Sequence, residues 1–288
     1  MSSKNCSSVN YSYFETPQFL RNFLFSVTFL SFPIYLVGFY CILCKTPAKS
    51  NGLKWCLLIS ATWFASQDLI LNILVIPFVL LPMYAGCPLG FLTEFFNVSI
   101  ITQAYLVVLV VVVSLTFLNL IVLNIPYQPS ALSIVFQVLP CLPQHIYNMP
   151  IFVLTLHLEI TSFIMMFLIA SVFLEFIVLF SSTYYQLFMI GSVTMSKNTR
   201  KYQKSVFIDV SIQNSIPVVV ILLPVSYLVY SCLNSYHNQL YNNLVLILMS
   251  CHGVISVSTM IILHKPYREF LFCKKKVINS VRTVSYRA

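Results

Sequence analysis

Residues 23–55 read FLFSVTFLSFPIYLVGFYCILCKTPAKSNGLKW. The part from Phe23 to Cys44 is apolar and uncharged, and it is long enough for a helix to cross a bilayer core, which takes about 20 residues. Lys45, Lys49 and Lys54 follow before the next apolar run begins at Trp55. Because lysine and arginine are retained at the cytosolic ends of membrane helices, this stretch predicts a spanning helix that ends in the cytosol.

The composition of the whole chain agrees with a membrane protein. Of its 288 residues, 59% are hydrophobic and 8% are charged, against roughly 25% charged in an ordinary soluble domain. A soluble domain could not cover so much apolar surface with so few ionic groups. The net charge of +9 does not indicate nucleic-acid binding, because the basic residues form short clusters between apolar runs and none occurs from Trp55 to Ser196.

The apolar runs predict an all-α fold, a polytopic membrane helix bundle. Six spans are clear, at about 23–44, 55–82, 95–125, 155–190, 205–233 and 243–263. We expect residues 1–22 to form an extracellular tail, 23–264 the transmembrane bundle, and 265–288 a cytosolic basic tail. Besides the lysines after the first run, two further basic clusters mark cytosolic connectors: Lys197, Arg200, Lys201 and Lys204, and then Lys265, Arg268, Lys274, Lys275 and Lys276.

The number of spans conflicts with the orientation of the two ends. The N-terminal tail carries two glycosylation sequons, at Asn5 and Asn10, which could be used only outside the cytosol. An outside N-terminus and an inside C-terminus require an odd number of crossings, but six are counted. Residues 125–150 contain five prolines and no apolar stretch of spanning length, so they predict an extracellular loop. One crossing is therefore missing between residues 95 and 151.

Several motifs in fixed order resemble the nematode serpentine receptors of class H, which are seven-helix chemoreceptor-like proteins. The resemblance covers nearly the whole chain. It is carried by Tyr40–Pro47 with Lys54-Trp55, Pro82–Gly90, Leu139–Pro143, Ser196–Arg200, Gln203-Lys204, Ile212-Gln213, Ile216-Pro217, Tyr236, Asn238-Gln239, Asn242-Asn243, His252-Gly253 and His264–Arg268. It implies a bundle of the seven-helix receptor type, a heterotrimeric G protein as partner, a small-molecule ligand, and a place in the plasma membrane of a sensory cilium.

The chain departs from that family in its middle. Family members carry an acidic-Asn-Arg group at the cytosolic end of the third helix, a basic second inner loop, and a separate fourth helix. This chain has no arginine between Arg21 and Arg200. Residues 96–106 resemble the outer part of the family's third helix, and residues 115–128 resemble the outer end of its fourth. We infer that the inner parts of both helices and the loop between them are absent.

Ionisable groups inside a bilayer are costly and are candidates for function. Asp68 lies 13 residues after Trp55, about 20 Å along a helix. It could link helices, with Asn72 one turn away, and shift between receptor states; a structural carboxyl that sets packing is the commoner role. His157 and Glu159 could line a ligand cavity or face water at the interface. His252 beside Gly253 favours close helix packing over ligand contact.

Two kinds of covalent modification are predicted for the outer loops and the C-terminal tail. Cys87 and Cys141 both fall in predicted outer loops, where an oxidising environment permits a disulfide. After Pro266 a short interfacial helix is expected, with Phe270 and Leu271 in the membrane surface. Cys273 would then be a candidate for palmitoylation.

The cytosolic face offers two groups of residues to a partner. By the resemblance, a G protein would be contacted by Arg200, Lys201, Lys204, Pro266, Tyr267 and Arg268. The alternative role of these charges is to set topology and to attract anionic lipid, worth about 1 kcal/mol per residue near the surface. The two roles do not exclude each other.

Three functions remain open from the sequence. The first is a chemosensory G-protein-coupled receptor, and the second is a non-functional family member from a damaged gene or a wrongly assembled exon structure. The third, a small transporter or channel, is disfavoured because no internal repeat is present. No H-E-x-x-H, G-x-S-x-G or Walker sequence occurs, so an enzyme is not predicted, and no cofactor or metal is expected.

Overall fold

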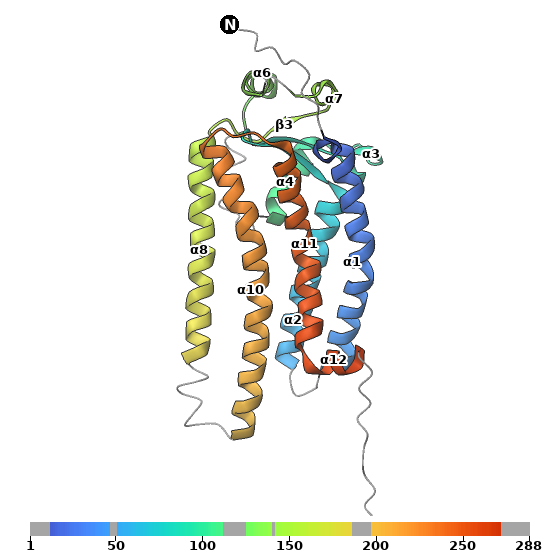
Figure 1. Cartoon of the computed structure of the whole chain (residues 1–288), viewed down its shortest axis with the longest axis vertical. Coiled ribbons are helices and arrows are strands. Elements are labelled where there is room, and N and C mark those ends of the chain that lie inside the picture. The colour runs from blue at the N-terminus through green and yellow to red at the C-terminus, as the bar shows by residue number, and fades with distance from the viewer. Residues whose placement is uncertain (1–11, 47–50, 112–124, 140–141, 186–196, 272–288) are drawn as a thin grey trace, which may run out of the picture.

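The structure is a computed structural model that describes residues 12–46, 51–111, 125–139, 142–185 and 197–271. Its long helices run between the two ends of an elongated bundle (Figure 1). One end, here called the strand end, carries the strands β1 (Pro77–Leu80), β2 (Ala85–Pro88) and β3 (Phe152–Val153). The opposite end, called the α12 end, carries the short helix α12 (Lys265–Leu271), which lies across the bundle there.

Five long helices connect the two ends in the described part of the chain. They are α1 (Pro17–Lys45), α2 (Asn51–Leu69), α8 (Leu158–Tyr185), α10 (Lys197–Leu233) and α11 (Gln239–Leu263). Among the described residues, three helices are long and apolar enough to cross a membrane, at Pro17–Lys45, Lys54–Leu74 and Gln239–Leu263. At about 1.5 Å per residue, α8 and α10 extend roughly 42 and 56 Å, which also exceeds a bilayer core of about 30 Å.

The second helix ends earlier than the predicted span 55–82. α2 passes into a π-helical turn, η3 (Ile70–Leu74), which the N–H of Val75 closes by donating to the carbonyl of Ile70 at 2.9 Å. Ile76 then takes the left-handed conformation, with φ of 46°, and Pro77 has no N–H to continue a helix. Residues 77–80 therefore form β1, which pairs antiparallel with β2, while β2 pairs with β3.

The predicted third span, 95–125, does not form a continuous helix in the structure. Asn97 has a φ of 47°, which breaks the helix after the short α3 (Phe91–Glu94). A new helix, α4 (Ile100–Val111), starts where the Oγ of Ser99 accepts from the N–H of Thr102 at 3.2 Å. Its described part has 12 residues. Residues 112–124 lie outside the described part.

Beyond that gap the chain is again at the strand end. The side chain of Gln128 makes two hydrogen bonds with the backbone of Val153 in β3, of 3.0 and 2.9 Å. The predicted outer loop 125–150 lies here, and it contains two short helices, α6 (Gln128–Val138) and α7 (Gln144–Tyr147). Residues 100 and 125 thus lie at the same end. The described residues contain five long helices that run from end to end, so the six predicted spans are not confirmed.

Two apolar cores hold the bundle. The first lies below the strand end and joins α1, the strands, α6 and α11 through residues such as Leu24, Phe78, Val135 and Ile247. The second lies toward the α12 end and joins α1, α2, α11 and α12 through Ile42, Leu57, Met260 and Tyr267. In the described residues α8 packs on α10, at the side of the bundle (Figure 1).

The return of the chain to the strand end can be tested by labelling. Ser130 on α6 is exposed at that end, and Lys201 is exposed on the first turns of α10 at the other. A membrane-impermeant maleimide should label Ser130→Cys from the same side as an N-terminal tag, and label Lys201→Cys only from the opposite side. The unaltered chain reports the background from the native cysteines. Labelling of both positions from one side would contradict this fold.

Candidate functional site

Asp68 lies in the interior of the bundle, where α1, α2 and α11 meet. Its side chain is 2% exposed, and the hydroxyl of Tyr35 on α1 donates to its Oδ2 at 2.6 Å. A buried carboxyl group is costly unless it is hydrogen-bonded, so this bond is what allows Asp68 to lie here. The contact ties the last turn of α2 to α1.

Gly253 brings the backbone of α11 against this pair. A Cβ at this position would lie 2.5 Å from Oη of Tyr35 and 2.9 Å from Oδ1 of Asp68. A larger residue would therefore displace the Tyr35 hydroxyl and the Asp68 carboxyl group, or move α11 away from the other two helices. Small residues at such positions allow membrane helices to approach closely. The glycine in the His252-Gly253 motif thus has a direct packing reason.

The cluster also contains polar atoms that lack a partner. Among the described residues, Oδ1 of Asp68 and both amide atoms of Asn72 are buried without a hydrogen bond. Asn72 is fully buried and lies in the π-helical turn that follows α2. Turns of this type are frequent at functional sites. An unpaired buried polar group is costly. A different packing of the helices that gave these atoms hydrogen-bond partners would therefore be favoured.

His252 belongs to the same region but has its own partners. Its Nε2 lies 3.2 Å from Oε1 of Gln67 on α2, and its Nδ1 contacts the carbonyl of Met249. The edge of its ring meets Phe64 at a centroid distance of 5.7 Å. The side chain is 7% exposed and packs between α11 and α2. The structure therefore brings Asp68 and His252 into one interface.

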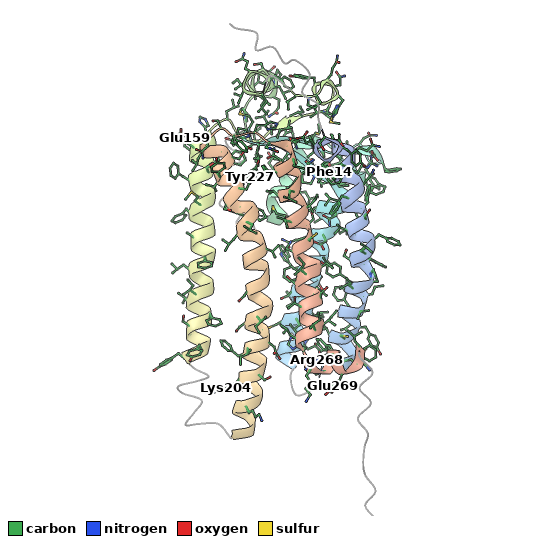
Figure 2. All side chains as sticks on the ribbon, viewed as in Figure 1. Phe14, Glu159, Lys204, Tyr227, Arg268 and Glu269 are labelled. Carbon is green, nitrogen blue, oxygen red and sulfur yellow. The ribbon has the colours of Figure 1, made fainter. Side chains whose placement is uncertain are left out.

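His157 and Glu159 lie far from that interface, at the strand end. Both are exposed, at the start of α8 (Figure 2). This pair was predicted either to line a ligand cavity or to face water at the membrane interface. The exposure of both side chains is compatible with the second role. Arg21 also lies at this end, and its guanidinium makes a bidentate ion pair with Glu94 of α3. That pairing neutralises the charge of Arg21 at the strand end.

A row of amides on α11 was missed as a site by the sequence reasoning. Gln239, Asn242 and Asn243 are all buried on the first turns of the helix. Gln239 donates to the carbonyl of Val79 at 3.2 Å, and Asn243 donates to the carbonyl of Phe14 at 2.8 Å. The amide of Asn242 lies 3.0 Å from the hydroxyl of Tyr227 on α10. The signal was present, since residues three and four apart share one helix face.

The covalent predictions fall mostly outside the described residues. Asn5, Asn10, Cys141 and Cys273 all lie there, so glycosylation, the disulfide and palmitoylation stay predictions. Cys87 is described as a buried free thiol, and burial raises its pKa to about 12. Its sulfur lies 3.6 Å from Sδ of Met149. A further sequon, Asn97-Val98-Ser99, was not noticed in the sequence, and its Asn97 is exposed at the strand end.

The predicted partner-facing residues gather at the α12 end (Figure 2). Lys201 and Arg268 are exposed, Lys204 and Pro266 are half-buried, and the side chain of Arg200 is not described. Tyr267 is 2% exposed, and its hydroxyl lies 2.6 Å from Oγ1 of Thr46. Tyr267 therefore anchors α12 to the end of α1. Asp209 on α10 interacts electrostatically with His264 and Arg268.

These features define an integral membrane protein with a helix bundle joined by a buried polar cluster. The sequence pattern described as "Serpentine type 7TM GPCR chemoreceptor Srh" matches residues 15–118 and 106–276. The chain belongs to this family. It is 25% identical to serpentine receptor class H-72 of Caenorhabditis elegans, in an alignment that covers 90% of this chain and 85% of that protein. No solved structure matches the chain.

The two family matches overlap at residues 106–118 of this chain. The alignment with the nematode receptor has 298 positions, and 90% of 288 residues is about 259, which leaves about 39 positions as gaps in this chain.

The Tyr35–Asp68 bond yields a stability prediction. Tyr35→Phe should lower the free energy of unfolding by about 1–2 kcal/mol, since it leaves a buried carboxyl oxygen unpaired. Asp68→Asn should cost less, because the amide oxygen can still accept from Tyr35. The measurement is thermal unfolding of the purified protein in detergent. Tyr40→Phe, on the exposed side of α1, is the matched control, and an equal loss in that variant would count against the role of the buried bond.

Proposed function

We propose that this protein is a chemosensory G-protein-coupled receptor of the plasma membrane, with its strand end outside the cell and its α12 end in the cytosol. The observation that carries the orientation is the distribution of charge. Lys45, Lys54, Lys201, Lys265 and Arg268 all belong to the α12 end, while Arg21 at the strand end is paired with Glu94. The positive-inside rule assigns the basic end to the cytosol. By family, the site of action is a sensory cilium.

The proposed signal passes through the interface of α1, α2 and α11. A ligand changes the balance between two packings only by the difference in its affinity for them. The cluster around Asp68 suits such a balance, because part of its hydrogen-bonding capacity is unused in the described arrangement. A small molecule that binds among the outer halves of the helices would favour the alternative packing. His157 and Glu159 are candidates to meet a water-soluble ligand, since both are exposed at the outer end.

The cytosolic surface for the G protein is proposed to include Lys201 on α10 and Arg268 on α12. Both side chains are exposed at the same end of the bundle. Arg268 lies next to Tyr267, whose bond to Thr46 fixes α12 against α1. A movement of α1 relative to α11 would therefore be transmitted to the position of Arg268. This gives a physical link between the buried cluster and the partner surface.

We further propose that the complete receptor contains the segment that this chain lacks. The shared match at 106–118 supports its position, and the alignment gaps support a length of about 39 residues. Restoring two half-helices would raise the crossings from five to seven and keep both ends on their sides. Sequencing the transcript across codons 100 to 125 should reveal an in-frame addition of that size that encodes a basic loop. A transcript without it would favour the damaged-gene alternative.

Receptor activity can be tested by nucleotide exchange. Membranes that contain the protein should accelerate GTPγS binding to a purified heterotrimeric G protein when a panel of small water-soluble and volatile organic compounds is applied. Arg268→Ala should reduce the stimulated rate roughly fivefold, equivalent to about 1 kcal/mol. Lys54→Ala is the matched control, because the ammonium of Lys54 is bonded to the carbonyl of Leu43.

Two results would contradict the receptor proposal. One is that the protein reaches the cell surface but fails to accelerate nucleotide exchange with every compound and every G protein subtype tested. The other is equal loss of the stimulated rate in Arg268→Ala and Lys54→Ala at equal surface levels, which would show a general charge effect in place of a contact by Arg268.

A further inference from the structure

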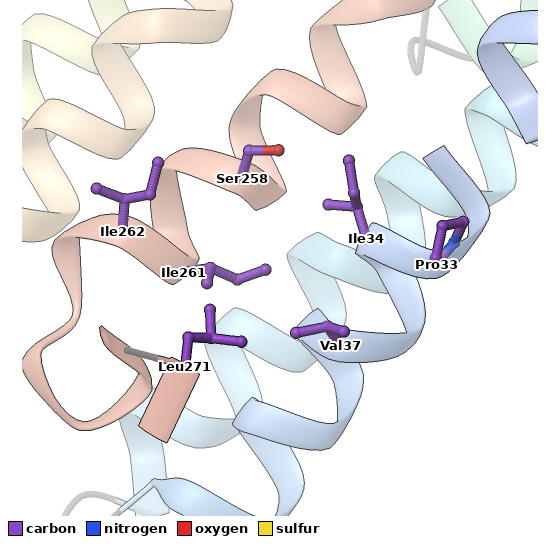
Figure 3. Close-up of a pocket in the computed structure, with 7 residues that line it drawn as sticks. All are labelled: Pro33, Ile34, Val37, Ser258, Ile261, Ile262 and Leu271. Carbon is purple, nitrogen blue, oxygen red and sulfur yellow. The ribbon is translucent and has the colours of Figure 1, made fainter. Parts of the chain in front are cut away.

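An apolar groove opens between α1, α11 and α12 near the α12 end (Figure 3). Its volume is about 300 Å³. It is lined by Ile34 and Val37 of α1, by Ser258, Ile261 and Ile262 of α11, and by Leu271 of α12. Pro33 of α1 lies at its edge. None of the functions proposed above uses this groove.

The groove is bounded by a close contact of α1 with α11. A Cβ at Gly38 would lie 2.7 Å from Cγ1 of Val257, the residue before Ser258. The two helices therefore touch beside the groove. α12 closes the groove at one end, since Leu271 lines it and Tyr267 anchors the helix to Thr46.

The side chains that line the groove and the surroundings of its open side determine which ligand can occupy it. Apart from the hydroxyl of Ser258, its described side chains offer hydrocarbon only. α1 and α11 are both long and apolar enough to span a membrane, and Ile262, which lines the groove, is 56% exposed, so we expect the open side of the groove to face lipid. An acyl chain is the apolar ligand that a bilayer supplies to such a surface.

A fixed cation stands next to the closed end. Lys45 is the last residue of α1, and its ammonium lies 4.4 Å from the ring centroid of Phe270, the neighbour of Leu271. The ring of Tyr40 lies 5.7 Å from the same ammonium and 5.4 Å from the ring of Phe270. Cation–π contacts of this kind hold a charge in place. Arg268 is exposed nearby on the same short helix.

We propose that the groove binds an anionic phospholipid of the cytosolic leaflet, with one acyl chain between α1 and α11 and its phosphate at Lys45. The inference rests on the orientation proposed above, because anionic lipids are concentrated in that leaflet. It does not depend on ligand recognition or on G-protein coupling. The bound lipid would join α1, α11 and α12, the three helices that connect the buried cluster to Arg268.

Lipid retention by the full chain tests the proposal. The purified protein is titrated in detergent with phosphatidylserine or with phosphatidylcholine of the same acyl chains, and bound lipid is counted by native mass spectrometry. Phosphatidylserine should bind at least fivefold more tightly. Lys45→Gln should lower its affinity about fivefold, to the level of phosphatidylcholine, since one basic residue near anionic lipid contributes about that factor. Val37→Phe should fill the groove and weaken both lipids.

Two matched variants make the outcomes decisive. Leu36→Phe adds the same ring one position earlier, where the side chain is exposed outside the groove, and Lys201→Gln removes a charge on α10. Both should bind lipid as the unaltered chain does. Equal binding of the two lipids, or equal loss in Lys201→Gln and Lys45→Gln, would overturn the proposal. The proposal would also be overturned if Cys273→Ser were the one variant that removed the bound acyl chain from the mass spectrum. The occupant would then be an acyl chain attached to that cysteine.

Discussion

The basic residues that the structure describes in the connectors belong to one end of the helical bundle, and a bilayer keeps such charges on one side. If the N-terminal tail, which carries the glycosylation sequons, lies on the side of the membrane opposite to the C-terminal basic residues, the number of crossings must be odd. The same constraint also requires the apolar run after residue 95 to return to the end from which it started. The structure meets both requirements, because Ile100 and Gln128 lie at the strand end, and Gln128 is held there by its bonds to Val153.

Within that frame, the packing of α1, α2 and α11 depends on one buried polar contact. Tyr35 satisfies one oxygen of Asp68, and Gly253 leaves the space in which the two side chains meet. The second oxygen of Asp68 and the amide of Asn72 remain without partners among the described residues. One oxygen of Asp68 is hydrogen-bonded and the other has no partner among the described residues, so we expect a change in helix packing to occur at this contact. The contact also explains why a carboxyl group is retained in the interior.

The sequence predicted much of this architecture, for reasons that individual residues make clear. Long apolar runs predicted helices in the regions where α1, α8, α10 and α11 lie, because a bilayer leaves a helix as the simple way to satisfy the backbone. α10 begins at Lys197, eight residues before the predicted span 205–233. The end of α2 was not predictable from hydropathy, since Val75 and Ile76 are as apolar as the helix before them. The break at Asn97 was missed because single polar residues do not interrupt a hydropathy window, although asparagine takes the left-handed conformation more readily than most residues. Asp68 was recognised as a site from its charge, whereas its partner Tyr35 lies 33 residues away and could be found only from the fold.

The orientation of the two ends is the claim that supports the rest. It is tested most directly by placing one tag before Ser2 and another after Ala288, and measuring antibody access in intact and permeabilised cells. The account predicts that the first tag is reached in intact cells and the second only after permeabilisation. Access to both tags in intact cells, or to neither, would mean an even number of crossings and would contradict the account.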